Sequence, residues 1–577
     1  MPTDHDVTPG NRRAHRRNTR SRGALGAASV LIALSLTALA CTKTNAPTSQ
    51  GATSNGNQQA GAAANQLEPE ETPKSGGKLV VAVTGETNGW NPGVNQWADA
   101  GVVVGASVLE TLMTFDEEGG WKPYLAESME PTRAGDFTSW TLKLKPGIKL
   151  HNGEKLDAKL VKKNIDYVHL TAALSSLALK DYYEGTTAKD DLTLEIKLKV
   201  NWASYPTVLA GQTGMIMAAA MLDAEDQGVK APIGTGPFVF ESWIPDTSFK
   251  AKKNPDYWQK GLPYLDAIEF LPIVDSQTRI NALRSGQVDI VMTNRAGDVA
   301  RAKEDFAVIK DWNSEKTHLL LNTLEDPTKK RNPLKNVHAR RALAYATNRE
   351  LLINTIAEGE DVQSSTTPIV ASTKFKMDEA DTGYYPYDQA KAREEIELYK
   401  KDTGYEDFSF EFSGLANQDD IAIMQNLQQQ WKEVGIECNI STVEQTAYIS
   451  QLVLGGYQAG YFRNYAYPDP DSNYFFWSSD TAKGLGVLSI NFTQYKSDRV
   501  DAALAKGRSS ADPAARRDAY IELTKGLNEG AVNTWLFNTP FSLITQKNVR
   551  GLNQARKQGF GNFLPKPWLL PTLWRAS

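Results

Sequence analysis

Two kinds of strand pattern in one chain set the main limit on its fold. Residues 79–83, Leu-Val-Val-Ala-Val, form a continuous apolar run rich in β-branched side chains. Such a run is typical of a strand covered on both faces, as in a parallel sheet. Apolar and polar residues instead alternate over 140–150 and 192–200, which predicts antiparallel strands with one wet face. We therefore expect an antiparallel-rich module over 113–225, distinct from the sheet of the first strand.

The second half of the chain has the pattern of helices that alternate with strands. Apolar residues recur at helical spacing over 417–434, which predicts an amphipathic helix, and 436–443 then has the pattern of a strand. Further helices are expected near 340–355 and over 387–401, the last with Asp388 as its N-cap. This alternation predicts a separate α/β lobe.

Residues 1–40 are typical of a secretory signal. Six arginines lie among residues 1–22, and the 18 residues 23–40 are uncharged and rich in Leu, Ala and Val. The sequence Ala38-Leu-Ala-Cys41 resembles the bacterial lipoprotein signal, in which the cysteine thiol is acylated and becomes the new N-terminus. An uncleaved membrane helix is the rival interpretation, because 18 residues are at the short end of what spans a bilayer. The Arg16-Arg17 pair leaves the twin-arginine export route as a further alternative.

Composition limits the remaining possibilities. Residues 41–75 are expected to be a flexible tether, because small and polar residues dominate them and bury too little apolar surface to fold. Loss of the signal removes six of the 63 basic and two of the 68 acidic residues, which leaves 57 against 66, a net charge of −9. That balance disfavours nucleic acid and anionic membranes as partners. Cys438 is the only cysteine besides Cys41, so no disulfide framework is expected.

From residue 76 onwards, a series of short phrases follows one order along the chain. They are GGKLVVA at 76–82, LAESME at 125–130, WTLKLKPGIKLHNGEKLDA at 140–158, GTGPF at 234–238, NPDYW at 254–258, ALRSGQVDI at 282–290, ARRALAYATNRE at 339–350 and QQQWKEVGIE at 428–437. One phrase alone is weakly specific, but the ordered set is specific. Together they resemble family 5 of the extracellular solute-binding proteins, the oligopeptide- and dipeptide-binding subunits of ABC importers.

The resemblance implies an α/β, two-lobed periplasmic-binding-protein-like (type II) fold with an extra antiparallel-rich domain. The expected parts are lobe I at 76–112, 226–308 and 535–577, the inserted domain II at 113–225, and lobe III at 309–534. The chain would cross between lobes near 308 and 535. Two crossing strands make a hinge, and the ligand is expected in the cleft that it closes.

The main candidate ligand contacts follow residue 460. In peptide-binding relatives, an aspartate four residues before the equivalent of Pro470 binds the ligand's α-ammonium, and here Ala466 stands at that position. Asp469 or Asp471 would replace it only after a shift of the loop. The candidate contacts are Arg463, Asn464, Tyr465, Tyr467 and Asp469. Guanidinium and phenol groups give contact area and directional bonds; the alternative is that some of these tyrosines pack in the core.

A second set of candidates lies near the start of the folded chain. The resemblance places Gln96, Trp97 and Ala98 where relatives pair with the ligand backbone in a strand-like manner. The alternative for Trp97 is that it fills the surface of its own lobe.

The expected function is capture of a peptide-like solute by a monomer that is lipid-anchored outside the cytoplasm and delivers it to an ABC permease with its ATPase. Ala466 keeps a modified or non-peptide ligand, such as a sugar or metal chelate, as an alternative. A sensor accessory shares every feature above.

No catalytic residue, metal site or cofactor is predicted. The chain has six His and no HExxH or Gly-x-Ser-x-Gly motif, so a hydrolase is a remote alternative. Residues 469–473 mimic half of a calcium loop, but Tyr474 stands where that loop requires glycine.

The N-terminal interpretation predicts the outcome of one substitution. Cys41→Ala removes the thiol that would carry the lipid, so the protein is expected to be released in soluble form and still bind its solute. Fractionation of cells that express either form measures this. A variant retained in the membrane would indicate an uncleaved helix.

Overall fold

The computed structural model describes residues 68–576, except for 96, 117–119, 171–176, 178, 227, 313–314, 326–330, 371–372, 466 and 554–568. The expected signal, Cys41 and most of the tether therefore lie outside the described residues, as do Gln96 and Ala466. Within the described part, no helix combines the length and the apolar character needed to span a bilayer.

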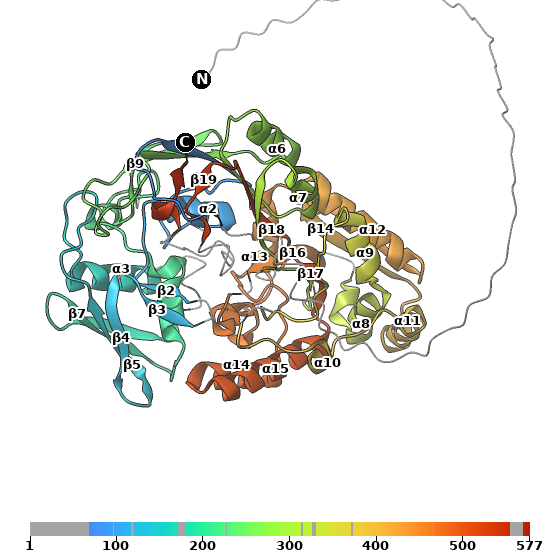
Figure 1. Ribbon diagram of the computed structural model, residues 1–577. Helices are drawn as coiled ribbons and strands as arrows, with labels where there is room; N and C mark the ends of the chain where they lie inside the picture. Colours follow the sequence, from blue (N-terminus) through green and yellow to red (C-terminus); the bar gives the residue numbers. More distant parts are fainter. Residues whose placement is uncertain are drawn as a thin grey trace, which may run out of the picture. The chain divides into compact units, whose positions relative to one another are not determined.

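A seven-stranded mixed sheet has the order β12-β18-β11-β1-β10-β9-β8. Figure 1 labels two of its strands, β9 and β18. Its strands are β1 Lys78–Val83, β8 Phe238–Ile244, β9 Ser248–Lys253, β10 Ala267–Pro272, β11 Ile290–Thr293, β12 Ala307–Asp311 and β18 Phe541–Thr545. Strand β1 runs parallel to β10 and to β11. Leu79, Val81, Ala82 and Val83 are buried, so the predicted two-sided strand with parallel neighbours is confirmed.

Three helices accompany this sheet: α2 Asp99–Gly105, α6 Ser276–Arg284 and α7 Ala296–Ala302. We call the sheet with these helices the seven-strand lobe. Helix α6 begins at a regular N-cap, because the Asp275 side chain accepts from the backbone N–H of Thr278. Helix α7 follows β11 after two residues, Asn294 and Arg295, and this short connection matters for the site described below.

A second, five-stranded sheet has the order β15-β14-β16-β13-β17. Its strands are β13 Glu315–Leu321, β14 Phe408–Leu415, β15 Ile436–Val443, β16 Ala459–Tyr465 and β17 Asn533–Asn538. The helices around it are α8 Val337–Ala346, α9 Arg349–Ile356, α10 Glu379–Thr382, α11 Gln389–Thr403, α12 Gln418–Lys432, α13 Gln445–Leu454, α14 Asp498–Ser509 and α15 Pro513–Gly530. We call this assembly the five-strand lobe. Figure 1 shows α8, α9, α11 and α12 together on one side of its sheet.

Most sequence predictions for this lobe are confirmed. Helix α12 covers the predicted 417–434, with Asn417 as its N-cap, and β15 coincides with the predicted strand. Helix α11 begins after Asp388, whose side chain accepts from two backbone N–H groups, as predicted. The single helix expected near 340–355 is wrong. It is two helices, because the backbone is extended at Thr347 and the Asn348 side chain caps α9.

The predicted antiparallel module is a four-stranded sheet of order β4-β5-β7-β6. Its strands are β4 Ala126–Arg133, β5 Asp136–Leu144, β6 Tyr183–Ala188 and β7 Thr193–Leu198, all paired antiparallel. From Trp140 onward in β5, and throughout β7, every second residue is buried, as Leu142 and Ile196 are, which confirms the predicted one-sided pattern. We call this sheet, with α3 Ala158–Leu170 and the chain as far as η1 Tyr205–Ala210, the four-strand domain. A small hairpin of β2 Met113–Phe115 and β3 Trp121–Pro123 precedes it.

The chain passes between the two larger sheets twice. The first crossing joins Asp311 at the end of β12 to Glu315 at the start of β13, and the second joins Asn538 of β17 to Phe541 of β18. The sequence placed these crossings near 308 and 535, but β12 and β17 each continue for about three residues beyond those points. The domain boundaries themselves remain a prediction.

The packing of β14 predicts the cost of one core substitution. Phe412 is fully buried and its ring centroid lies 5.5 Å from that of Trp431. Phe412→Ala is expected to lower the free energy of unfolding by about 3–5 kcal/mol, because it removes a buried ring and leaves a cavity. Leu398→Ala on α11, where the side chain is 40% exposed, is the control and should change it by less than about 0.5 kcal/mol. Urea unfolding followed by circular dichroism measures both, and equal midpoints would contradict the prediction.

Candidate functional site

The carboxyl ends of parallel strands from the two larger sheets face each other. In the seven-strand lobe, β11 ends at Thr293 and is followed by Asn294 and Arg295. In the five-strand lobe, β14 is followed by α12, which carries Asp419 in its first turn. Arg295 and Asp419 form an ion pair between the lobes. Ligands of α/β proteins bind at the carboxyl ends of strands, where neighbouring connections diverge, so this meeting place is the candidate site.

Arg463 on β16 is the central cation of the candidate site. With the Asn294 amide turned so that its oxygen faces the guanidinium, Asn294 accepts a hydrogen bond from Arg463 across the lobe boundary. Within its own lobe, the Arg463 Nη1 atom lies 3.6 Å from Glu315 Oε2. The Arg463 side chain is 29% exposed, against 4% for Glu315. Arg463 is therefore held from both lobes and still reaches solvent.

Carboxylates surround Arg463 and keep it charged. Burial lowers the pKa of Arg463, but the carboxylates of Glu315, Asp99 and Asp420 outweigh this effect and leave the pKa above its ordinary value. Asp99 belongs to α2 of the seven-strand lobe and accepts from the Thr84 hydroxyl, with 3.1 Å between the oxygens. Burial raises the pKa of Asp420 to about 6, against the opposing effect of Arg463. One cation thus lies among three acidic groups from two lobes.

Glu315 is the acidic group most affected by its surroundings. Burial raises the pKa of Glu315 to about 7, the Arg463 guanidinium opposes this shift, and the Asp99 carboxylate adds to it. The next residue, Lys316, is also buried, and burial lowers its pKa to about 7. Lys316 Nζ donates to Asn538 Oδ1 at 2.5 Å. Glu315 and Lys316 are therefore two ionisable residues at the start of β13, directly after the first crossing. Lys316 also bonds to Asn538, the last residue of β17 before the second crossing.

The candidates at the end of β16 lie beside this cluster. Asn464 is buried, and no hydrogen-bond partner for its Oδ1 atom is present among the described residues. Tyr465 is the last residue of β16 and pairs with Glu315 across the sheet. The structure therefore brings Arg463, Asn464 and the Tyr465 backbone to the candidate site.

The candidates on the other lobe are divided. Trp97 is buried, and its Nε1 donates to the carbonyl oxygen of Gly89 at 2.9 Å. Its ring lies so close to α2 that a Cβ atom on Gly105 would be 2.4 Å from it. This geometry favours the alternative in which Trp97 fills its own lobe, and its contact with a ligand stays a prediction. Ala98 is partly exposed and directly precedes Asp99.

The candidates after β16 have mixed surroundings. Tyr467 is partly exposed, and its ring centroid lies 6.1 Å from that of Phe115 in the β2–β3 hairpin. Asp469 is 1% exposed and accepts from Arg516 Nη2 at 2.6 Å. This placement gives Asp469 a structural role and leaves its carboxylate no free surface in this arrangement. Its contact with a ligand also stays a prediction.

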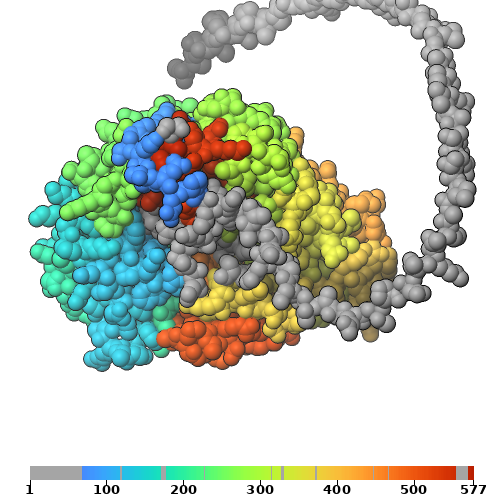
Figure 2. Space-filling model, in the orientation of Figure 1, coloured from blue at the N-terminus to red at the C-terminus, as the bar shows by residue number. Residues whose placement is uncertain are grey.

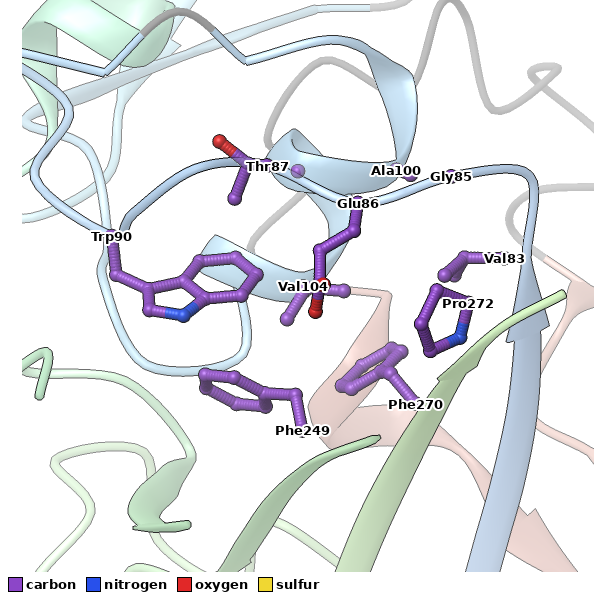
Figure 3. A pocket seen from close by; sticks show the side chains of 11 residues that line it. Val83, Gly85, Glu86, Thr87, Trp90, Ala100, Val104, Phe249, Phe270 and Pro272 are labelled. Carbon is purple, nitrogen blue, oxygen red and sulfur yellow. The ribbon is translucent and has the colours of Figure 1, made fainter. Parts of the chain in front are cut away.

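A small pocket lies beneath α2 in the seven-strand lobe (Figure 3). Figure 3 shows Glu86 reaching down between Trp90 on one side and Pro272 on the other. The Glu86 carboxylate accepts from Trp243 Nε1 at 2.6 Å. The cavity volume is about 10 Å³, which is room for about one water molecule. This pocket is too small for a solute and belongs to the packing of α2.

Comparison with known proteins identifies the family. The family model described as bacterial extracellular solute-binding proteins, family 5 Middle, matches residues 120–485. The chain belongs to this family. As a family 5 protein, it is the solute-binding subunit of an ABC importer and acts outside the cytoplasm.

Curated relatives of this family 5 chain include two glutathione-binding proteins named GsiB. The one from Pectobacterium atrosepticum is 26% identical over 479 residues, covering 79% of this chain and 86% of the relative. The one from Escherichia coli K12 is 27% identical over 438 residues, covering 72% and 80%.

Superposition on solved structures identifies the fold. The oligopeptide-binding protein AppA from Bacillus subtilis, in complex with a nonapeptide, superposes with a TM-score of 0.75 at 22% identity, covering 88% of this chain and all of AppA. AgaA from A. tumefaciens R10, in complex with agropinic acid, gives a TM-score of 0.74 at 22% identity, covering 87% and 99%. The predicted periplasmic-binding-protein-like type II fold is confirmed.

Several polar and charged residues of the candidate site were not predicted from the sequence. They are Asp99, Asn294, Arg295, Glu315, Asp419 and Asp420. A signal for some of them was present, because Asn294 and Arg295 directly follow the apolar strand β11. Their partners belong to the other lobe, and no sequence spacing relates the two.

The raised pKa of Glu315 predicts a pH-dependent difference in stability. A buried acid whose folded pKa is about 7, above the ordinary 4.5, stabilises the fold fully below pH 4.5 and loses this contribution as the pH rises through 7. Glu315→Gln, which stays neutral, should therefore gain stability relative to the wild type between pH 5 and pH 8, by up to about 3 kcal/mol. Urea unfolding at several pH values measures the difference. Glu397→Gln, at a 71% exposed side chain, is the control, and a difference independent of pH for Glu315→Gln would contradict the prediction.

Proposed function

We propose that this family 5 protein captures a small peptide-like zwitterion between its seven-strand and five-strand lobes, with Arg463 as the anchor for a carboxylate of the solute. The observation that carries this proposal is the position of Arg463. Its guanidinium extends from β16 to Asn294 of the other lobe and remains partly exposed. A guanidinium binds carboxylates through paired hydrogen bonds, so a solute carboxylate would take the place of the neutral Asn294 amide.

The acidic groups near Arg463 suit the ammonium group of the same solute. Ala466 replaces the aspartate that binds the ammonium in peptide-binding relatives, and Asp469 is engaged by Arg516. Asp99 and Asp420 act electrostatically on Arg463 from the two lobes. Negative charge is thus available on both sides of the candidate site, and a zwitterion would be matched at both of its ends.

Peptide-like chemistry is supported by the relatives. The curated relatives are named for glutathione, and solved neighbours were determined with a nonapeptide and with the peptide STSA. The Gln96, Trp97, Ala98, Asn464, Tyr465 and Tyr467 positions complete the proposed contact set. Pairing of the ligand backbone with such segments would add affinity with little dependence on side chains.

A non-peptide acid or chelate is the second candidate ligand class. The substitution at Ala466 favours it, and solved neighbours include AgaA with agropinic acid and the Campylobacter jejuni NikZ with Ni(L-His). Arg463 would serve such ligands equally well where they carry a carboxylate. The two ligand classes differ in one requirement: a peptide-like solute has an ammonium group that acidic side chains of the site must bind.

The proposed mechanism is a population shift without covalent chemistry. The Arg295–Asp419 pair and the Arg463–Asn294 contact join the two lobes at the candidate site. A solute that contacts both lobes favours closure by its differential affinity for the closed form. The closed protein, a monomer held at the membrane by a lipid on Cys41, would then deliver the solute to the permease, whose ATPase drives release.

A binding measurement tests the proposal. Isothermal titration of the full-length protein with reduced glutathione should show binding, and Arg463→Gln should raise the Kd by about 30-fold, because a charge-assisted pair contributes roughly 2 kcal/mol. Arg393→Gln on α11 is the matched control and should leave the Kd unchanged, because among the described residues this guanidinium donates to the backbone carbonyls of Gln389 and Glu433 in its own lobe.

Two outcomes would decide against the peptide-like solute. Binding of Ni(L-His) or agropinic acid without binding of glutathione would transfer the proposal to the second ligand class. An Arg463→Gln variant that binds like the wild type would remove Arg463 as the anchor. Turnover of glutathione by the purified protein would contradict a pure binding role.

A further inference from the structure

Two aspartates hold the segment that follows the ligand-facing end of β16. Asp469 and Asp471 flank the start of η4 (Pro470–Phe476) and are each 1% exposed. Each is paired with a buried arginine: Asp469 with Arg516 of α15 at 2.6 Å, and Asp471 with Arg508 of α14 at 3.3 Å. Burial of a charge without partners costs several kcal/mol, so both pairs fix this segment firmly.

The two aspartates differ in what else they bind. Among the described residues, the Asp469 carboxylate accepts from Arg516 and from the backbone N–H of Asp471, both in the five-strand lobe. The Asp471 Oδ2 atom instead accepts from Trp202 Nε1 at 2.6 Å and from the Ser204 hydroxyl at 2.6 Å. Trp202 and Ser204 belong to the four-strand domain. Asp471 is therefore shared between two parts of the molecule.

Arg508 extends this shared cluster. Its guanidinium lies over the Tyr474 ring at 3.7 Å, over the Trp202 ring at 4.4 Å and over the Tyr182 ring at 4.9 Å. The backbone carbonyl of Arg508 also accepts from the N–H of Ala203 at 2.8 Å. In Figure 2, the cyan surface of the four-strand domain meets the orange-red surface of α14 and α15.

We infer that Asp471 is a positioning residue that couples closure of the four-strand domain onto the five-strand lobe to solute binding at the end of β16. This inference rests on the proposed solute capture. Separation of the two parts would take away both donors from the four-strand domain and expose the Asp471–Arg508 pair. We call the bonds of Asp471 to Trp202 and Ser204 the latch. Five residues separate Tyr465, at the end of β16, from Asp471, so one short segment connects the ligand contacts to the latch.

The rival interpretation is a permanent joint. In that case the four-strand domain and the five-strand lobe move together, and the bonds of Asp471 affect stability alone. The two interpretations differ in whether loss of the donors from the four-strand domain changes solute release and the distance between the two parts.

The test removes the two donors and leaves Asp471 in place. The variant is Trp202→Phe with Ser204→Ala, which keeps a ring and a small side chain at the two positions. Tyr520→Phe is the matched control, because the Tyr520 hydroxyl accepts from Arg516 Nη2 at 2.7 Å in the neighbouring cluster of Asp469, within the five-strand lobe. If Asp471 couples closure to binding, the rate of release of reduced glutathione rises about tenfold in the donor variant, while the control and the association rate stay unchanged.

A ligand-free measurement keeps this inference separate from the proposed function. Spin labels at Lys197→Cys on β7 and Lys506→Cys on α14, both exposed, report the distance between the two parts by double electron–electron resonance. The donor variant should add a population at longer distance that is absent in the Tyr520→Phe control. Reduced glutathione should diminish that population.

The possible results distinguish a failure of the proposed function from a failure of this inference. If glutathione does not bind the wild type but the longer population appears in the donor variant, the proposed peptide-like solute fails and the latch stands. If the distance and the release rate are unchanged while the melting temperature falls, the contact is a permanent joint and the inference is wrong.

Discussion

Two short crossings between the sheets determine where the candidate site lies. Strands β11 and β12 are both antiparallel to β18, so they run in the same direction and end at one edge of the seven-stranded sheet. Strand β13 is antiparallel to β16 and β17, and β16 is parallel to β14. Because both crossings join the edge where β12 ends to the edge where β13 begins, the carboxyl ends of β11 and β16 face each other. The candidate site follows from this connectivity before any side chain is considered.

Electrostatics then decide which side chain at this edge is available to a solute. Glu315 begins β13 directly after a crossing, and burial raises its pKa to about 7. Burial therefore opposes the ionisation of this carboxyl group, which lies 3.6 Å from the Arg463 guanidinium. Under the proposed function, Arg463 is the group that a carboxylate of the solute pairs with. Arg295 pairs with Asp419 across the same boundary.

How much of this structure could be predicted depends on how many residues separate the interacting groups along the sequence. Strand β1, strands β5 and β7 and helices α11 and α12 were predictable because their patterns and caps lie within a few residues. The break between α8 and α9 was missed because Asn348 sits inside an otherwise helical pattern and acts as a cap. At the site, the family resemblance indicated the end of β16 through the position of the aspartate that binds the ligand's ammonium in relatives. Its partners Asp99, Asn294 and Glu315 were missed, because they belong to helix α2, to the connection after β11 and to the start of β13, and no local spacing records that these segments meet.

The aspartates of the pattern Asp469-x-Asp471-x-Asn473 pair with arginines. Its spacing resembles the start of a calcium loop, yet each carboxylate is neutralised by a buried arginine instead, and the described residues contain no group of three or more side chains suited to hold a metal ion. An arginine brings fixed donors and stacks on aromatic rings, as Arg508 does on Tyr474 and Trp202. A metal would hold this loop within one lobe. Arginine, with its aromatic neighbours, lets the same loop bond to a second part of the molecule, and that is what places Asp471 between the lobe that carries Arg463 and the four-strand domain.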